Sequence, residues 1–413
     1  MTPSTIAQLI DSPAAPSYEW LWTHYKWMHQ HPELSLEEEH TAAYIQRVLH
    51  DFDCEVKTGI GGHGIVAIFR NGEGPTALMR ADFDGLPVTE ATGADYASLN
   101  EGCMHACGHD IHTTALLGAC KLLDAVRSSW SGTFIALFQP AEEVTQGASM
   151  MLADGLGELI PRPDVCFGQH ILPGPAGTVF TTAGPAAAAC DTLTITIHGR
   201  SSHGSMPHLG VDPTIVAAHI ILRLQSIVGR EVYPGDFAVI TVGKLHAGTR
   251  NNIVPETAEL VLNTRFYDEE VRDRCYRSIE RVVKAECEAS ACPAEPEIVY
   301  SAHGELTDNS PEVFDTIRPV FDAAFGQRSQ DATPWTASDD FSEIPRHFGA
   351  PYVYWTLGMT PQEVWDADPA AAPSNHQPDF LPDPQPTLTA AWQAAALAPL
   401  SYLAKQPRES FRA

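Results

Sequence analysis

The sequence predicts an α/β protein: a mixed, mostly parallel central sheet flanked by helices, with a two-layer α+β module inserted into it. Short apolar runs bounded by glycine, proline or charged residues are typical of strands buried on both faces. A segment that alternates polar and apolar residues in the middle of the chain indicates a separate, half-buried antiparallel sheet. At 413 residues the chain is long enough for two domains.

Four apolar runs predict strands of the central sheet, and three of them are followed by polar side chains. The runs are residues 64–69, 76–79, 133–138 and 164–167. Residues 80–84 follow the second run, residues 139–143 the third and residues 168–170 the fourth. Ligand sites in open α/β sheets lie at the carboxyl ends of strands. We therefore expect the acids and histidine of these three segments to share one crevice.

The inserted module begins with the alternating segment. Residues 191–198 place Leu193, Ile195 and Ile197 on one face, which is typical of a half-buried strand. An amphipathic helix follows from Pro213 to about residue 228, with Asp212 as its cap. The remaining predicted elements are strands at 238–242 and 258–262, a helix at 269–289 and a strand at 296–300. The order β-α-β-β-α-β is a compact two-layer module. We place it at residues 187–300, within a catalytic domain formed by residues 1–186 and 301–413.

Residues 102–112 hold two cysteines, three histidines and an aspartate. Cys107 and His109 are separated by one residue, so in an extended or loop conformation both side chains leave the same side of the backbone. A thiolate and an imidazole that converge in this way suit Zn²⁺ or a similar divalent ion. The alternative is a disulfide between Cys103 and Cys107, in which the interleaved histidines would have no role.

The adjacent acids Glu142 and Glu143 are the second informative feature. Neighbouring side chains point in different directions, so one carboxylate can bind a metal ion while the other accepts a proton from a metal-bound water. The alternative is an acidic first helical turn, with Pro140 near its start and the helix dipole favouring the charges. The position after a buried strand, together with the Cys/His cluster, favours the catalytic interpretation.

Seven motifs in order along the chain resemble those of the metal-dependent amidohydrolases. This family includes aminoacylases, hippurate hydrolases, auxin–amino acid conjugate hydrolases and, more distantly, carboxypeptidase G. The motifs begin at His29, Arg80, Met104, Gln139, Ser202, Asn252 and His376 and extend to Phe380. The chain looks most similar to bacterial aminoacylases that act on Nα-acyl amino acids, including the acyl-glutamine type. The resemblance implies a zinc-exopeptidase-like catalytic domain with an inserted lid and dimerisation domain.

The resemblance also implies a centre of two divalent metal ions in each subunit. Its ligands would be Cys107, His109, Glu143, His170 and His376, with the Cys107 thiolate as the bridge. Glu142 aligns with the general base, and Asp84 with an acid that supports the metal site. Asp110 and His112 would orient His109 and its loop. Zinc is the expected metal, with manganese, cobalt and nickel as alternatives.

In the lid, the resemblance implies roles for three residues and a homodimer as the assembly. His203 would reach the active site, often that of the partner subunit, and donate to the oxyanion. Asn252 would hydrogen-bond the substrate. Arg265, which we expect on the last lid strand, would pair with the free α-carboxylate, because guanidinium is the preferred partner of a carboxylate. Without the resemblance, Arg265 would be interpreted as an ordinary surface charge. Ala187 stands where many relatives have methionine, which suggests room for a bulkier acyl group.

Composition restricts the classes of partner and the compartment. Asp and Glu number 52 against 25 Lys and Arg, and the resulting formal charge of −27 argues against nucleic-acid or anionic-membrane binding. No basic-then-apolar leader is visible, and no uninterrupted apolar run approaches ~20 residues. Cys107 must stay reduced to bind a metal ion, which favours a reducing compartment and a cytoplasmic location.

The sequence therefore predicts a metal-dependent amidohydrolase that cleaves the amide bond of N-acyl amino acids and releases a carboxylic acid and a free amino acid. One alternative is a carboxypeptidase or dipeptidase on the same scaffold, which would share every metal residue and differ only in the acyl pocket. A more distant alternative is a non-catalytic binding protein. The intact base Glu142 and the five intact ligands argue against that alternative, since a binder has no chemical need for the full set.

Overall fold

The computed structural model describes residues 1–405 and divides into two compact units. The first unit contains residues 1–186 and 308–333 and the chain from residue 340 onward. The second contains residues 187–307 and 334–339. The short strands β7 (Gly184–Ala187) and β14 (Thr307–Asn309) lie where the chain passes from one unit to the other. The expected end of the insert at residue 300 falls inside strand β13 (Glu297–Gly304).

The first unit is built on an eight-stranded mixed sheet with the strand order β1-β2-β4-β3-β5-β16-β6-β15. Its strands are β1 (Glu55–Ile60), β2 (Gly64–Asn71), β3 (Thr76–Asp82), β4 (Gly132–Gln139), β5 (Val165–Pro175), β6 (Val179–Thr181), β15 (Ser329–Asp331) and β16 (Tyr352–Thr360). The central strands β4, β3, β5 and β16 pair in parallel, whereas β1 and β2 add to one edge in antiparallel fashion. The predicted mixed, mostly parallel sheet is confirmed.

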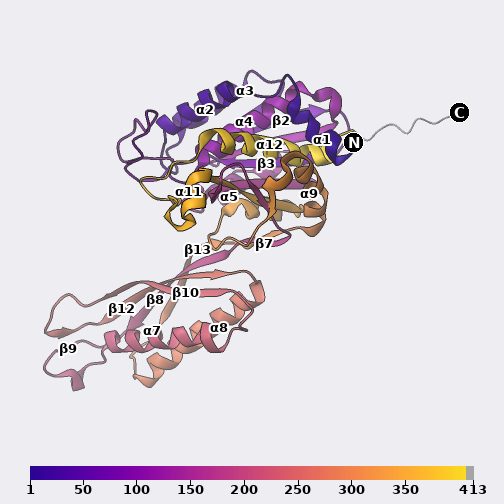
Figure 1. Cartoon of the computed structure of the whole chain (residues 1–413). Helices are drawn as coiled ribbons and strands as arrows, with labels where there is room; N and C mark the ends of the chain where they lie inside the picture. Colours follow the sequence, from indigo (N-terminus) through magenta and orange to yellow (C-terminus); the bar gives the residue numbers. More distant parts are fainter. Residues whose placement is uncertain (406–413) are drawn as a thin grey trace. The chain divides into compact units, whose positions relative to one another are not determined.

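Helices cover both faces of this sheet (Figure 1). They are α1 (Pro3–Ala7), α2 (Tyr18–Gln30), α3 (Glu39–Leu49), α4 (His109–Ala125), α5 (Gly147–Ala153), α6 (Leu156–Leu159), α9 (Pro311–Phe325), α10 (Glu343–Phe348), α11 (Gln362–Ala367) and α12 (Pro384–Leu403). Alternate side chains of β2 enter opposite cores: Ile65 and Phe69 pack with α4 and α12, and Val66 and Ile68 with α5 and α10. Burial on both faces explains the continuous apolar runs. Within residues 1–405, no helix is both long and apolar enough to cross a membrane.

Strand β5 is longer than its apolar run indicated. The run predicted a strand ending near residue 167, with His170 beyond its end, but β5 continues to Pro175 and contains His170. The pairing with β16 simply goes on through the polar residues, and His170 lies opposite Thr356. Position 168 of this strand suits glycine, because the Cβ of any other residue would lie 2.8 Å from the Tyr354 ring. His170 therefore reaches the site from within a strand.

The second unit has a four-stranded antiparallel sheet, β10-β12-β8-β13, with two helices on one face (Figure 1). Besides β13, its elements are β8 (Ala189–His198), β9 (Ser202–His203), α7 (Pro213–Arg230), β10 (Ala238–Ala247), β11 (Ile253–Val254), β12 (Thr257–Phe266) and α8 (Glu269–Ala289). Leu193, Ile195 and Ile197 all enter the core under the helices, and Asp212 caps α7 by accepting from the Thr214 N–H at 2.9 Å. The predicted two-layer order is confirmed. The placement of Arg265 on the last lid strand is wrong, because Arg265 lies on β12 and β13 follows α8.

Candidate metal centre

Cys107 and His109 meet at a turn that only glycine accommodates well. Gly108 between them has φ +91°, in the left-handed region, and His109 is the first residue of α4. A Cβ at Gly108 would lie 2.3 Å from Cδ1 of Ile171. Of the two conformations expected, extended or loop, the structure has the loop, and the two side chains converge through its left-handed turn. Cys103 and Cys107 are both free thiols, so the alternative of a disulfide between them is wrong.

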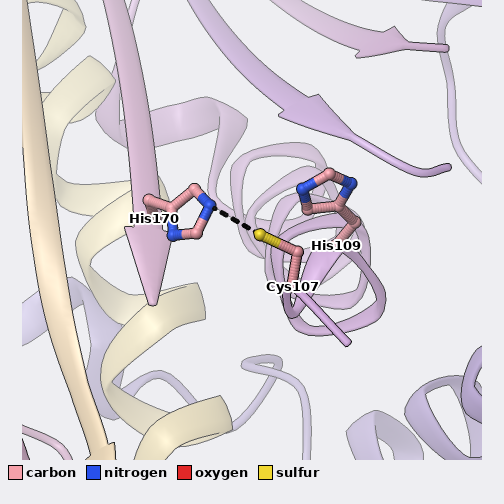
Figure 2. A group of neighbouring side chains, drawn as sticks. All are labelled: Cys107, His109 and His170. Carbon is pink, nitrogen blue, oxygen red and sulfur yellow. Dashed lines mark hydrogen bonds between the residues drawn. The ribbon is translucent and has the colours of Figure 1, made fainter. Parts of the chain in front are cut away.

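The first group of potential ligands is Cys107, His109 and His170, which are all buried (Figure 2). One ligand atom from each lies within 4.8 Å of the others. Nε2 of His170, on β5, faces the Cys107 Sγ at 3.4 Å, while its Nδ1 donates to the Ile171 carbonyl at 2.8 Å. Nε2 of His109 is buried and has no hydrogen-bond partner among the described residues. The three atoms enclose a space suited to one cation.

The second group is Cys107, Glu143 and His376, again with one ligand atom of each within 4.8 Å of the others. Nε2 of His376 lies 3.3 Å from the Cys107 Sγ and 3.4 Å from Glu143 Oε2. Oε1 of Glu143 is buried and, within the described part of the chain, has no hydrogen-bond partner. Because Cys107 belongs to both groups, its sulfur lies where a bridging ligand between two cations would be.

Asp84 connects the two groups. Its Oδ1 accepts from Nδ1 of His109 at 3.1 Å, and its Oδ2 accepts from the Ser35 hydroxyl at 2.7 Å and the Glu143 N–H at 3.0 Å. Burial acts to raise the pKa of Asp84, but the hydrogen bond and charge of His109 and the bond from Ser35 bring it below its usual value. Asp84 therefore remains a carboxylate and holds His109 with Nε2 directed away from it.

Glu142 and Glu143 lie in a turn between β4 and α5 rather than in a helix. Ala141 and Thr145 have φ +53° and +52°, and the Thr145 N–H donates to the Glu142 carbonyl at 2.6 Å. Since α5 begins only at Gly147, the alternative of an acidic first helical turn is wrong. Oε2 of Glu142 lies 3.8 Å from Nε2 of His109, and the residue is 7% exposed. Glu142 thus borders the space that the first group of ligands encloses.

His112 and Asp110 make hydrogen bonds to other segments and not to His109. The side chain that orients the His109 ring is Asp84. Nε2 of His112 accepts the Ile171 N–H at 3.0 Å, and its Nδ1 donates to Asp82 at 2.6 Å. With both ring nitrogens engaged, His112 has no nitrogen left for a metal ion. Asp110 accepts from His29 at 2.7 Å.

Two groups of the cluster, His376 and Cys107, retain their protons to higher pH than usual. Hydrogen bonds to Cys107 and Glu143 raise the pKa of His376 to about 10. Burial raises the pKa of the Cys107 thiol. Both pKa values are raised, so the His376 ring and the Cys107 thiol hold their protons more tightly than they would in water. A divalent ion would replace those protons, which is the usual coupling between metal binding and proton release.

Two neighbours of the cluster were missed from the sequence. Ser35 donates to Asp84, and Asn375 donates to the carbonyl groups of Cys107 and Ile171 at 3.2 Å each. The only signal for Asn375 was its position next to His376. Ser35 carried no signal, because its partner lies 49 residues away.

The three predicted lid residues belong to the second unit. His203 on β9 is exposed and pairs with Ile253 on β11, and the Gly204 N–H donates to the Asn252 carbonyl at 2.7 Å, so His203 and Asn252 are neighbours. Arg265 on β12 is half-buried and donates to the Ser338 hydroxyl at 2.8 Å.

Comparison with known proteins gives consistent matches. Residues 78–397 match the model of peptidase family M20/M25/M40. N-acetyl-L-cysteine deacetylase of Bacillus subtilis is 37% identical over 332 residues, which cover 79% of this chain and 78% of the relative. Hippurate hydrolase of Campylobacter jejuni is 36% identical over 318 residues, which cover 76% of this chain and 82% of the relative. The crystal structure of Bacillus subtilis YXEP, described as a dinuclear metal binding peptidase from the M20 family, has a TM-score of 0.77 at 27% identity, covering 93% of this chain and 98% of that chain.

The matches extend over most of the chain and agree in both sequence and fold. They confirm the predicted resemblance to the amidohydrolases. The chain therefore belongs to peptidase family M20/M25/M40 and is an amidohydrolase-type enzyme of that family.

Proposed function

We propose that this enzyme binds two divalent ions and hydrolyses the amide bond of N-acyl amino acids. One observation carries the proposal: two groups of ligand atoms share the Cys107 sulfur, and the cluster contains two buried atoms without a hydrogen-bond partner among the described residues, Nε2 of His109 and Oε1 of Glu143. A buried polar atom without a partner is costly. These two atoms lie 3.8 Å apart in one cluster, and we interpret both as metal ligands.

The donor set fits zinc. One thiol, three imidazoles and one carboxylate are the nitrogen, sulfur and oxygen ligands that Zn²⁺ takes, and manganese, cobalt and nickel accept similar sets. Cys107, His109 and His170 would hold one ion, and Cys107, Glu143 and His376 the other. When bound, the ions supply Lewis-acid polarisation of the scissile carbonyl and make water easier to deprotonate.

Glu142 is the proposed general base. Its carboxylate borders the first ligand group, while Glu143 belongs to the second. Glu142 is therefore assigned to proton transfer and Glu143 to metal binding. Glu142 would take a proton from the attacking water and return it to the leaving nitrogen, a role typically worth roughly 10²–10⁴-fold in rate. Asp84 would keep His109 in the required tautomer through the bond to Nδ1.

The proposal also gives roles in substrate binding to the three lid residues. We assign Arg265 to the free α-carboxylate of the amino acid, Asn252 to the substrate amide, and His203 to the developing oxyanion. A guanidinium pairs well with a carboxylate, and two relatives are named N-acetyl-L-cysteine deacetylase and hippurate hydrolase. Peptide cleavage on the same scaffold is the competing function, since other relatives are named carboxypeptidases.

A substrate panel tests the proposal. The chelated protein, reloaded with zinc, manganese, cobalt or nickel, is assayed on N-acetyl and N-benzoyl amino acids and on dipeptides. We expect metal-dependent release of free amino acid from the N-acyl compounds and a loss of roughly 10²-fold or more for Glu142→Gln. Preferred cleavage of dipeptides would favour the peptidase, and no turnover by any loaded form would overturn the proposal.

We further propose that the second unit mediates homodimer formation. Large apolar side chains on this unit are exposed, including Leu222 at 71%, Tyr233 at 69% and Leu245 at 55%. Contact with a second copy of the chain would remove this apolar surface from water. Light scattering should give the mass of two chains, and Leu222→Lys with Leu245→Lys should shift it toward one; a wild-type protein with the mass of one chain contradicts this.

A further inference from the structure

One side-chain amide connects the segments that carry the ligands. Nδ2 of Asn375 lies 3.2 Å from the Cys107 carbonyl and 3.2 Å from the Ile171 carbonyl, and it lies 3.8 Å from the Cys107 sulfur. These partners are 268 and 204 residues away in the sequence. Ile171 directly follows the ligand His170, and Asn375 directly precedes the ligand His376. The amide therefore links the segment that carries His376 to two other ligand-bearing segments.

The segment around His376 depends on such contacts. His376 has φ +67°, a left-handed conformation that costs energy for a residue with a side chain, and its side chain is 53% exposed. The backbone N–H of His376 donates to the Ala106 carbonyl at 2.7 Å. A strained conformation persists only where its surroundings fix it. The hydrogen bonds from the Asn375 side chain help to fix this one.

The first ligand group is supported differently. His109 is held by Asp84, and His170 lies within β5, where its Nδ1 bonds to the Ile171 carbonyl and His112 accepts the Ile171 N–H. Neither ligand depends on Asn375 alone. The second group, in contrast, needs His376 to stay beside the Cys107 sulfur.

We infer that Asn375 is a positioning residue that keeps the second ligand group assembled, so that the ion held by Glu143 and His376 binds tightly. The inference rests on the proposed two-metal function. The role requires a hydrogen-bond donor, because both partners are carbonyl oxygens. Aspartate has nearly the same shape as asparagine but cannot donate when ionised, and its charge would repel the two carbonyl groups.

Asn375→Asp therefore tests the inference, with Asn71→Asp as the matched control. Nδ2 of Asn71 also donates to two carbonyl groups, those of Arg127 and Trp130 at 2.6 and 2.7 Å. Asn71 pairs with Gly132 at the start of β4, whereas Glu142 and Glu143 follow the end of that strand. The two variants thus make the same chemical change at opposite ends of the sheet.

Zinc titration of the chelated proteins against a chromophoric competitor gives the two stepwise affinities. We expect Asn375→Asp to weaken one of the two ions by roughly 10–100-fold, the usual effect of removing a group that orients metal ligands. Asn71→Asp should bind both ions as the wild type does. With cobalt in place of zinc, Asn375→Asp should show the thiolate-to-cobalt absorption of a single ion at concentrations that give the wild type two.

The outcomes separate this inference from the proposed function. Two ions bound to Asn375→Asp with wild-type affinities would overturn the inference and leave the proposed function intact. Equal weakening of both ions, accompanied by the same effect in Asn71→Asp, would also overturn it, because general loss of stability would then be the cause. A wild-type protein that binds fewer than two ions would overturn the proposed function and this inference with it.

Discussion

Replacing His29 with asparagine should change how the stability of the protein depends on pH, because the structure gives His29 a raised pKa. His29 is 1% exposed; its Nδ1 lies 2.7 Å from Asp110 Oδ2 and its Nε2 3.4 Å from Glu90 Oε1. Burial disfavours the charged ring, but the hydrogen bonds to Asp110 and Glu90 raise the pKa of His29 to about 9 from 6.5. Both ring nitrogens therefore donate, and the folded state binds this proton more tightly than the unfolded chain.

The size and sign follow from proton linkage. A tenfold change in proton affinity corresponds to ~1.4 kcal/mol, so a rise from 6.5 to about 9 contributes about 3 kcal/mol to the free energy of unfolding. Because the folded pKa is the higher one, the whole contribution is present below the unfolded value of 6.5. It is lost as the pH rises through about 9.

Urea unfolding of the chelated wild type and of His29→Asn, each at pH 6 and pH 10, measures this effect. Asparagine keeps a donor toward Asp110 and removes the titrating ring, and titrating groups that do not interact with His29 cancel in the double difference. The stability difference between the two proteins should be about 3 kcal/mol larger at pH 6 than at pH 10. An equal difference at both values, or a larger one at pH 10, would refute the reasoning.

Further predictions concern the metal site. Asp84→Asn should lower zinc affinity by roughly 10–100-fold, because the amide cannot hold His109 as the carboxylate does; competitive zinc titration measures it, and an unchanged affinity would count against the role of Asp84. Gly108→Ala should lower the thermal midpoint of the chelated protein, since a Cβ there meets Ile171 at 2.3 Å in a left-handed turn; calorimetry measures it, and an unchanged midpoint would contradict the steric argument.

Much of the fold could be predicted from local patterns. The runs around Val66 and Ile135 are continuously apolar because both faces of the sheet are covered, and the alternation of Leu193 and Ile195 shows that only one face of the second sheet is covered. The length of β5 could not be predicted, because Gly168 and His170 stay in the strand through pairing with β16, nearly two hundred residues later.

The candidate site was only partly visible in the sequence. Glu142 and Glu143 were recognisable from their position after a buried strand, but the proximity of His376 to Cys107 followed from family resemblance alone. No local pattern brings together residues so far apart. The left-handed turn at Gly108 and the bonds made by Asn375 depend on packing against Ile171, a tertiary contact that composition and periodicity do not encode.

Anomalous diffraction at the zinc edge, from crystals of the wild type grown with zinc, tests the shared-sulfur centre most directly. The account predicts two peaks, each about 2.3 Å from the Cys107 sulfur, one also touching His109 and His170 and the other Glu143 and His376. A single peak that leaves out Cys107, or none near these side chains, would contradict it.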